Sequence, residues 1–440
     1  MRSLSATLTA NQKSYSRPPL LKLVMTKSGE ATQTYDISSS TNRIIGSTHI
    51  EQEWSQIASF AIDSDTTLAG LSLKGYTGTI SYGYNDATNG DEYSACAPLE
   101  VMVQPTSTLL NRAQSQLVTS FTLVGVFDMM SADRASADHK QESDDTRTVK
   151  TLLTAIAGGT LAPFSHCKSY TITFDPEDSL INSYIPADYF SVSAGESRLS
   201  SFRKLIGTTK CKARIEADGA IHIFNPTISG SSYDYQYNDA VTNHNFFEKE
   251  TRSRLVIPNK MLVSSHPKVP VAEQFSGNAV DASSYSALGR YIDSRPHYIR
   301  ATSDAQCTAI ATALLQQLQV DSERGHGIAF MNCGQEVMDY VLITDSVASD
   351  TRAGNIGYIK RDYTPGKKFS MEFRFGRLAA EMPFMSFVGD EAAFLTQADW
   401  DEMKAYIKEL NDLLADWVAS IDTVPKWHVR KELRIPEAYN

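Results

Sequence analysis

The chain has 440 residues, which is too long for one ordinary domain and predicts roughly two to four. Its apolar fraction of 42% is enough to build packed cores, which excludes a disordered chain. The formal net charge of −10 argues against a broad nucleic-acid-binding face, because such a face needs clustered Lys and Arg.

Targeting and redox signals are weak in this sequence. The first sixteen residues contain no apolar run, and no stretch of about 18 apolar residues occurs, so we expect neither a signal peptide nor a membrane span. The cysteines are odd in number, scattered and without a CxxC pair, which predicts free thiols of a chain folded in a reducing cytosol, with no disulfide framework or zinc site. They are Cys96, Cys167, Cys211, Cys307 and Cys333.

The first third of the chain is rich in predicted strands. Short apolar runs cover Leu20–Met25 and Trp54–Ile62, and the segment from Tyr76 to Tyr84 alternates apolar with small polar residues. An alternation of period two predicts half-buried strands. Asn89-Gly90 follows and predicts a tight hairpin turn. Several short strands separated by turn residues are typical of a barrel or sandwich.

A polar segment, Ser131–Thr146, separates these strands from a region of mixed pattern and predicts a domain boundary. The next region combines amphipathic helices with short strands and predicts a compact α+β unit. Asp218-Gly219 between two of the strands is the strongest hairpin signal. The predicted elements are a helix over Val149–Ile156 closed by Gly158, a strand over Ser169–Phe174, a helix over Leu199–Ile206 closed by Gly207, and strands over Lys210–Glu216 and Ala220–Asn225.

A second β-rich region follows. Residues 262–288 are rich in Ser, Pro and Ala and are predicted to be irregular, whereas Cys307–Leu318 carries the clearest buried helical pattern in the chain. Strands are expected again over Val337–Thr344, Ile356–Arg361 and Phe369–Phe375.

The last 60 residues predict a helix that begins at a capping-box-like Thr396 and Asp399 and runs to about Ser420. Its apolar residues are spaced 3, 4, 3, 4, 3, which is a heptad pattern. We interpret it as a candidate inter-subunit or docking helix; packing on the chain's own second barrel is the alternative. The residues are Trp400, Met403, Ile407, Leu410, Leu414 and Trp417.

Four stretches give the chain a resemblance to a known family. They are KGYTGTISYGY (74–84), SRLSSFRKLIGTTKCKARIEADGAIHIFNP (197–226), ALGRYIDSRPHYIRATSDAQCTAIATALLQQL (287–318) and EVMDYVLITDS (336–346). They occur in a chain whose predicted order is a β-domain, an α+β insert and a second β-domain. With this order the chain resembles the baseplate or tail-hub proteins of tailed phages and related contractile machines. The resemblance covers roughly residues 18 to 378.

The resemblance implies an α+β, β-dominated fold with two tail-tube-like β-barrel or sandwich domains, an α+β insert and a C-terminal helical extension. The expected parts are a first barrel at 1–130, a linker at 131–146, an α+β domain at 147–228, a second barrel with one packed helix at 229–378, and the helical extension at 379–440.

The resemblance also implies a homotrimer, in which three copies present six barrels to a hexameric tail tube. Expected partners are the tail tube protein, the distal tail protein and fibre or spike proteins, with genomic DNA passing transiently during ejection. The expected location is the tail tip of the virion, after synthesis in the host cytoplasm. No cofactor, metal or catalytic residue is implied.

Enzymatic chemistry has few candidates in this sequence. His166 and Cys167 are adjacent, and on a strand their side chains would point apart. The acidic pairs at Asp144-Asp145 and Asp175–Asp178 suit a linker and a turn better than the paired carboxylates of a glycosidase. Two rival functions remain open: a trimeric carbohydrate-binding adhesin, favoured by 20 Tyr and four Trp, and a tail-associated cell-wall hydrolase.

One oxygen-rich loop could hold calcium, but a solvated hairpin loop around Asn89-Gly90 is the favoured interpretation. Its residues are Asn85, Asp86, Asn89, Asp91 and Glu92.

Overall fold

The computed structural model describes residues 1–376 with gaps at 15–16, 39–41, 65–67, 69, 87, 103–105, 112–115, 240–243, 254–256, 266–269, 295, 321–322 and 367. These residues belong to one compact unit. The predicted helical extension at 379–440, with all six residues of the candidate docking helix, lies outside the described residues.

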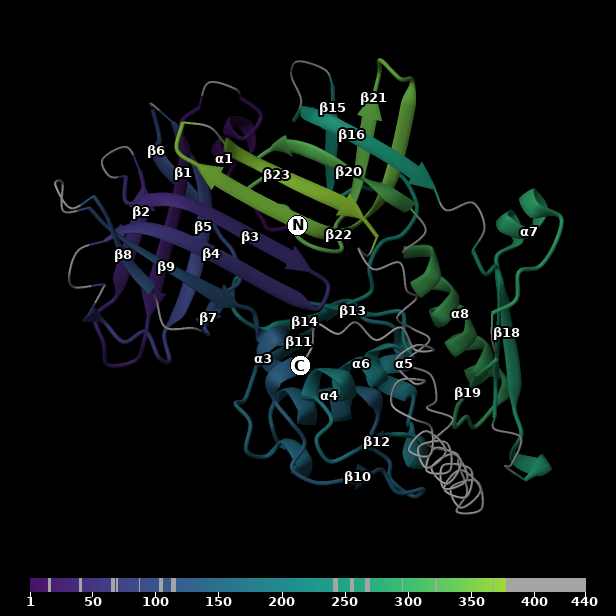
Figure 1. Cartoon of the computed structure of the whole chain (residues 1–440). Coiled ribbons are helices and arrows are strands. Elements are labelled where there is room, and N and C mark those ends of the chain that lie inside the picture. The colour runs from purple at the N-terminus through teal and green to yellow at the C-terminus, as the bar shows by residue number, and fades with distance from the viewer. Residues whose placement is uncertain are drawn as a thin grey trace, which may run out of the picture. The chain divides into compact units, whose positions relative to one another are not determined.

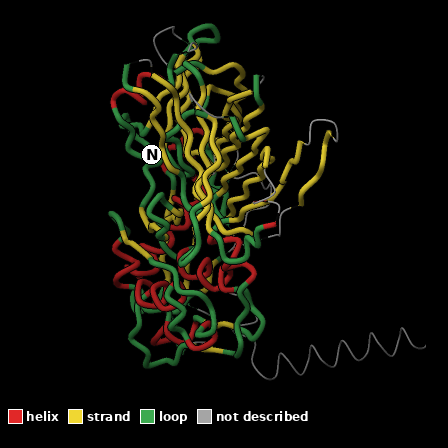
Figure 2. The backbone as a smooth tube through the Cα atoms, turned by 90° about the vertical axis from the view of Figure 1, so that its left-hand side faces the viewer, coloured by secondary structure: helices red, strands yellow, loops and turns green. Residues whose placement is uncertain are grey.

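The structure is α+β and β-dominated, with 41% strand and 21% helix, which confirms the predicted fold class. Figure 2 shows the strands gathered in one part of the described chain and most of the helices in another. Two hydrophobic cores correspond to these parts, one inside the large sheet and one among the helices.

The first part of the sheet, here called the first lobe, contains β1 to β9 in the order β3-β4-β9-β7-β5-β1-β2, with β6 on β5 and β8 on β9 (Figure 1). β5 forms where the alternation predicts a strand, but its residues 80–84 are all buried and the strand is not half-buried there. The turn at Asn89-Gly90 joins β5 to β6 with Asp86 opposite Gly90. The short helix α1 (Ala6–Asn11) packs against β5. The strands are β1 (Pro19–Thr26), β2 (Gln33–Ile37), β3 (Ile44–Gln52), β4 (Ser55–Ser64), β5 (Thr77–Asp86), β6 (Gly90–Ala95), β7 (Leu99–Val101), β8 (Thr106–Asn111) and β9 (Gln116–Val124).

The second lobe is built from the last strands of the described chain together with two earlier ones. Its order is β16-β20-β23-β22, and the N-terminal half of β22 also pairs with β21, which pairs with β15. The strands are β15 (Tyr235–Asn238), β16 (Phe246–Ser253), β20 (Glu323–Phe330), β21 (Tyr340–Asp345), β22 (Asp350–Thr364) and β23 (Lys368–Phe375).

The two lobes are joined by one strand pair, here called the seam, in which β22 pairs antiparallel with β3 from Tyr358↔Gln52 to Tyr363↔Ser47. The barrels expected from the sequence are therefore not closed by continuous ladders within the described residues. A strand has two edges, and β3 uses both, for β4 and for β22. The ends of each lobe meet only through an isolated bridge, Ile37↔Asn42 in the first and Tyr237↔His244 in the second.

The helical part is an α+β unit. Thr148 caps α4 through its side chain, and Gly158 ends the helix as the sequence predicts. The Asp218-Gly219 turn joins β13 and β14, and β11 adds to β14 in parallel. The elements are α3 (Val126–Ala132), β10 (His139–Lys140), α4 (Val149–Ala157), β11 (Ile172–Phe174), α5 (Ser179–Ser183), β12 (Ser191–Val192), α6 (Arg198–Ile206), β13 (Lys212–Ile215) and β14 (Ile221–Phe224).

Arg198 is fully buried at the centre of this unit. Its guanidinium donates to the carbonyls of Ile156 and Ala157 at the end of α4, at 2.8 and 2.5 Å, and to Asp133 at 2.9 Å. The C-terminal carbonyls of a helix lack intrahelical donors, so this arginine stabilises the end of α4. Asp133 and the paired strand β10 lie in the segment predicted as a linker; the domain division itself stays a prediction.

The expectation that residues 262–288 are irregular is wrong. They contain most of a small sheet, ordered β18-β17-β19, and a short helix, and we call this sheet and its helices the arm. Small residues on β18 let the predicted buried helix lie directly on the sheet, which local sequence does not reveal (Figure 1). The elements are β17 (Lys260–Ser264), β18 (Ser276–Val280), α7 (Ala282–Leu288), β19 (His297–Tyr298) and α8 (Asp304–Val320).

Candidate functional site at the junction of lobes and α+β unit

The end of β3 and the turn that follows it meet both lobes and the α+β unit. Glu51 and Glu53 are two residues apart, so their side chains leave the same face of the chain. Glu51 forms an ion pair with Arg361 of β22, and both side chains are buried. Glu53 forms an ion pair with Lys212 of β13 at 2.9 Å, and both are again buried. One short segment therefore connects the first lobe to its two neighbours.

A third ion pair completes the junction. Asp339, which precedes β21, accepts from Arg214 of β13 at 3.1 Å, and Arg214 also lies 3.5 Å from Glu336. Asp339 is buried, and this burial raises its pKa to about 6, although the positive charges of the N-terminus and Arg214 oppose the shift. Each contact between two of the three parts thus contains an ion pair; the pairs of Glu51 and Glu53 are buried on both sides, whereas Arg214 in the third is partly exposed. Breaking such a pair leaves an uncompensated buried charge, so the junction holds the parts in one relative position.

The electrostatics of the seam are dominated by Glu51 and Arg361. Burial alone would raise the pKa of Glu51, but Arg361 together with the nearby His49 and Arg2 outweighs this effect and lowers the pKa to about 2. Arg361 also donates to the carbonyl of Gln335 at 2.6 Å and lies over the ring of Tyr82. The carboxylate and the guanidinium both remain charged at neutral pH. The sequence contains a signal for this pair, because a charged residue sits at a buried position of an alternating strand in both β3 and β22.

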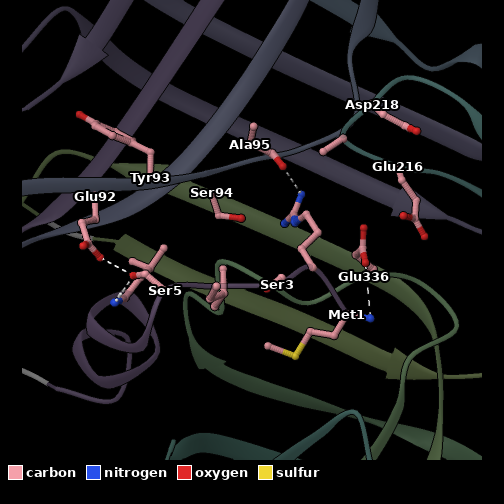
Figure 3. A pocket seen from close by; sticks show the side chains of 14 residues that line it. Met1, Ser3, Ser5, Glu92, Tyr93, Ser94, Ala95, Glu216, Asp218 and Glu336 are labelled. Atoms are coloured by element: carbon pink, nitrogen blue, oxygen red, sulfur yellow. Dashed lines mark hydrogen bonds and ion pairs between the residues drawn. The ribbon is translucent and has the colours of Figure 1, made fainter.

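A pocket of about 670 Å³ opens beside the junction (Figure 3). Its wall combines the N-terminal segment, β6 and the β13–β14 turn, and it includes the carboxylates of Glu92, Glu216, Asp218 and Glu336. Arg2 points into this wall and donates to the carbonyl of Ala95 at 3.2 Å. An acidic wall repels anions, so the pocket does not suit a phosphate or nucleic-acid ligand.

The seam also carries a shallow groove of about 750 Å³ formed by residues of β3, β4, β9 and β22. Six of its thirteen lining residues are Ser or Thr. Its acidic residue, Asp362, is held by Thr48 at 2.9 Å and by Lys360 and Lys368 at 3.1 and 2.6 Å. The groove can offer hydroxyl hydrogen bonds along sheet residues that belong to both lobes.

A second titratable cluster lies on the small sheet of the α+β unit. His222 of β14 contacts Asp175 at 2.8 Å through Nδ1 and Asp218 at 3.1 Å through Nε2, and Glu216 lies 3.8 Å away. Partial burial lowers the pKa of His222, but hydrogen bonds to Asp175 and Asp218 outweigh it, so the net shift is upward from 6.5. His222 therefore holds its proton more tightly in the folded chain than in the unfolded chain.

This shift predicts a pH-dependent stability. Because the folded pKa is raised, the contribution of His222 is fully present below about pH 6.5 and is lost as the pH rises through the folded pKa. We therefore expect wild type to lose stability relative to His222→Gln as the buffer changes from acidic to alkaline. The loss should be below about 1 kcal/mol, because solvent partly screens the charges of the cluster. Urea titrations at about pH 5.5 and about pH 8.5 measure it.

His297→Gln is a comparison of opposite sign: burial lowers the pKa of His297 to about 4, so the unfolded chain binds this proton more strongly, and the difference in unfolding free energy between wild type and His297→Gln should rise between about pH 5.5 and about pH 8.5. A pH-independent difference for His222→Gln would contradict the proposed ion pairs.

The adjacent residues His166 and Cys167 were considered as a catalytic pair. The two residues lie in a turn and not on a strand, so their side chains approach, with Cys167 Sγ 3.6 Å from His166 Nε2. Partial burial and the nearby Asp133 raise the pKa of the Cys167 thiol. A reactive cysteine needs a lowered pKa, so the environment disfavours a nucleophile.

The paired carboxylates take structural roles. Asp145 pairs with Arg147, and Asp178 caps α5. Glu177 pairs with Lys150 at 2.9 Å. Each of these acids therefore has a local partner, and they do not face one another across a cleft.

In the oxygen-rich loop considered for calcium, each acidic side chain accepts hydrogen bonds from different partners. Asp86 accepts from the backbone of Thr88 and Asn89, which holds its pKa below the usual value. Asp91 accepts from Asn85 at 2.5 Å, and Glu92 accepts from Ser5 at 2.7 Å. These acids are not among the ligand-like clusters of the described residues. The calcium hypothesis gains no support from this arrangement.

Comparison with known proteins identifies the fold. No protein-family model and no curated protein sequence matches the chain. The chain is similar to the structure of the tail protein from Neisseria meningitidis, with a TM-score of 0.55 and 9% identity over 82% of this chain and 96% of that one.

Other similar structures have lower scores. A prophage tail protein from Listeria monocytogenes has a TM-score of 0.48 and 10% identity, over 83% of this chain and 97% of that one. A prophage tail protein from Shewanella oneidensis has a TM-score of 0.45 and 11% identity, over 84% of this chain and 100% of that one.

The chain thus has the fold of a tail protein. The resemblance to phage tail-hub proteins, first drawn from the sequence, is confirmed as a likeness of fold. Within the described residues, no helix is both long and apolar enough to cross a membrane.

Proposed function

We propose that this chain is a non-enzymatic structural component of a phage tail tip. It forms a homotrimeric hub that joins the hexameric tail tube to distal tail and fibre or spike proteins and lines the channel through which DNA passes. The observation that carries the proposal is the fold shared with the Neisseria meningitidis tail protein over nearly the whole length of that protein.

The arrangement of the two lobes supports a symmetry-matching role. Each lobe is a set of strands whose ends approach through an isolated bridge, so one chain offers two sheet modules. Three copies related by a threefold axis would then present six modules to a hexameric ring. The seam and the buried ion pairs support a constant spacing between the modules, which a sixfold pattern requires.

Charge and sheet edges also support the proposal. A net charge of −10 is consistent with a channel to which DNA does not adhere. β2 and β16 lie at the two ends of the strand path and are candidates for edge pairing with a tube subunit, which would cover edges that otherwise promote aggregation.

The rival role as a carbohydrate-binding adhesin receives less support, because Tyr82 and Tyr84 are buried in the first lobe and cannot stack on a sugar. We further propose that the predicted C-terminal helix docks on a neighbouring copy through Ile407, Leu410 and the four other residues of its heptad pattern.

Light scattering coupled to size-exclusion chromatography tests the trimer. We expect a mass of about three times 48.5 kDa and threefold rings in negative-stain images. Ile407→Glu is expected to weaken the trimer at least tenfold, because it places a charge in the apolar pattern, whereas Lys408→Glu on the polar side is the matched control. A monomer at every concentration, without rings, would contradict the proposal.

A further inference from the structure

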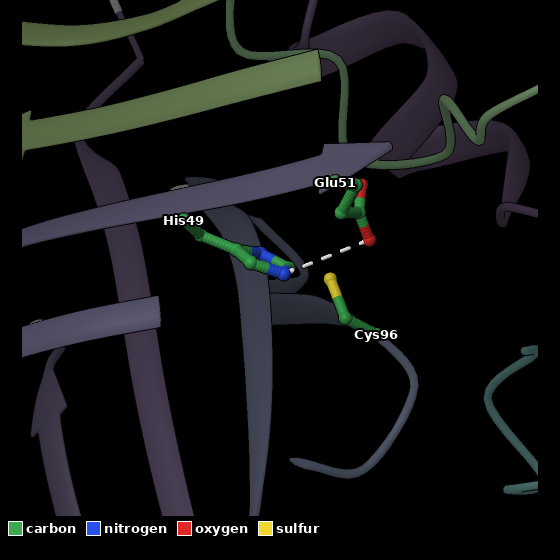
Figure 4. A group of neighbouring side chains, drawn as sticks. All are labelled: His49, Glu51 and Cys96. Carbon is green, nitrogen blue, oxygen red and sulfur yellow. Dashed lines mark ion pairs between the residues drawn. The ribbon is translucent and has the colours of Figure 1, made fainter. Parts of the chain in front are cut away.

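Three side chains from two distant segments meet inside the first lobe. His49 and Glu51 lie on the same face of β3, and Cys96 directly follows β6. One potential ligand atom from each lies within 4.8 Å of the other two, and His49 Nε2 is 3.7 Å from Glu51 Oε1. Figure 4 shows the sulfur of Cys96 directed into the space between the imidazole and the carboxylate. We propose that His49, Glu51 and Cys96 bind a single zinc ion.

The histidine supplies independent evidence for a ligand. Its side chain is 1% exposed, and both ring nitrogens are buried without a hydrogen-bond partner among the described residues. The ring stacks on Tyr82 at 6.2 Å, which fixes its plane but satisfies neither nitrogen. A buried polar atom without a partner costs about 1–3 kcal/mol. A metal bond to one nitrogen removes part of that cost.

Burial also prepares the ring for coordination. It lowers the pKa of His49 to about 4, so the imidazole is neutral at physiological pH and has a lone pair to donate. Burial raises the pKa of the Cys96 thiol, so the free cluster holds a protonated cysteine. Zinc would displace that proton, and the bond formed is between sulfur and zinc.

The combination of donors selects the class of metal. Imidazole, thiolate and carboxylate together suit zinc, whereas calcium and magnesium prefer oxygen ligands alone. Zinc bonds of about 2.0–2.3 Å place neighbouring ligand atoms roughly 3.3–3.8 Å apart. The separation of 3.7 Å between His49 Nε2 and Glu51 Oε1 is already in that range. All three ligand atoms lie within 4.8 Å of one another, so the Cys96 sulfur needs only a small movement toward the other two.

Nearby guanidiniums are the main opposing factor. Arg361 binds Oε2 of Glu51 and leaves Oε1 toward the histidine, and a hydrogen bond of this kind orients a ligating carboxylate. Arg2 donates to the carbonyls of Ala95 and Cys333, and it also faces the side chain of Cys96, where it would compete with the metal for the sulfur. Binding of zinc with loss of the thiol proton adds one positive charge, so we expect affinity to increase with pH.

Metal content of the purified full chain tests the proposal. After expression in zinc-supplemented medium and exhaustive dialysis, we expect about one zinc per chain by mass spectrometry. Cys96→Ser should lower this value at least fivefold. Cys333→Ser is the matched control, because Cys333 is equally buried but is not one of the three ligands.

Refolding with cobalt adds a readout of the sulfur bond. A thiolate–cobalt charge-transfer band is expected in wild type and in Cys333→Ser and should be absent in Cys96→Ser. If wild type contains no stoichiometric zinc and shows no such band after refolding with cobalt, the cluster is a metal-free polar network and the proposal is overturned. The wild-type measurement decides this even if Cys96→Ser fails to fold.

Discussion

Replacing Arg361 with Met is expected to lower the free energy of unfolding by about 3–5 kcal/mol, because it leaves the carboxylate of Glu51 buried without its partner. The pair also lies in the seam, so the loss should appear as a lower midpoint in urea unfolding. The measurement is made with a chelator present, which separates this effect from any bound metal.

Two variants show whether the cause is the unpaired charge. In Glu51→Leu/Arg361→Met both charges are removed, and we expect most of the stability to return, since apolar replacement of a buried pair is often neutral. Lys368→Met removes an exposed partner of Asp362 and should change stability by less than about 1 kcal/mol. Equal losses for the double and single variants would show that packing and not charge explains the effect.

Gly277→Val is expected to lower the free energy of unfolding by about 3 kcal/mol, at the upper end of the range for overpacking. Gly277 lies on β18 beneath α8, and an added Cβ would be 2.3 Å from the backbone nitrogen of Thr308 and 2.7 Å from the carbonyl carbon of Cys307. Backbone atoms cannot rotate away, so α8 would have to move off the sheet. Thermal unfolding followed by circular dichroism measures the loss.

Asn278→Val is the control for the arm. Asn278 is the next residue on β18 and is exposed, on the opposite face from α8, so this change should alter stability by no more than about 0.5 kcal/mol. A similar loss in both variants would mean that strand propensity, and not the contact between α8 and β18, sets the stability of the arm.

The junction and the proposed hub are connected through geometry. A hub that matches threefold to sixfold symmetry needs two modules whose relative position does not vary. Two of the three ion pairs at the junction are fully buried and the third has one buried partner, so partial separation of the parts would expose or unpair charges. Destabilising the seam should therefore weaken ring formation as well as folding, and Arg361→Met can be tested for both.

Local pattern in the sequence was sufficient for the fold class and for several elements. The helix α8, the caps of α4 and the hairpin at Asp218-Gly219 appear where periodicity, capping residues and turn residues predict them. These signals depend on residues within a few positions of one another, so they can be recognised in a single sequence. The resemblance to tail-hub proteins came from the order of such elements, and the structure confirms it as a likeness of fold.

Tertiary structure alone decided the contacts between distant residues. Glu51 and Arg361 are 310 positions apart, and no local pattern pairs them. His49 and Cys96 likewise meet only because β3 and the end of β6 border the same core, which is why the sequence indicated no zinc site. The two barrels are not closed because β3, which pairs with β4 along one edge, pairs along its other edge with β22 of the second lobe. Edge use and burial are properties of the whole packed chain, and they determine which charges become partners.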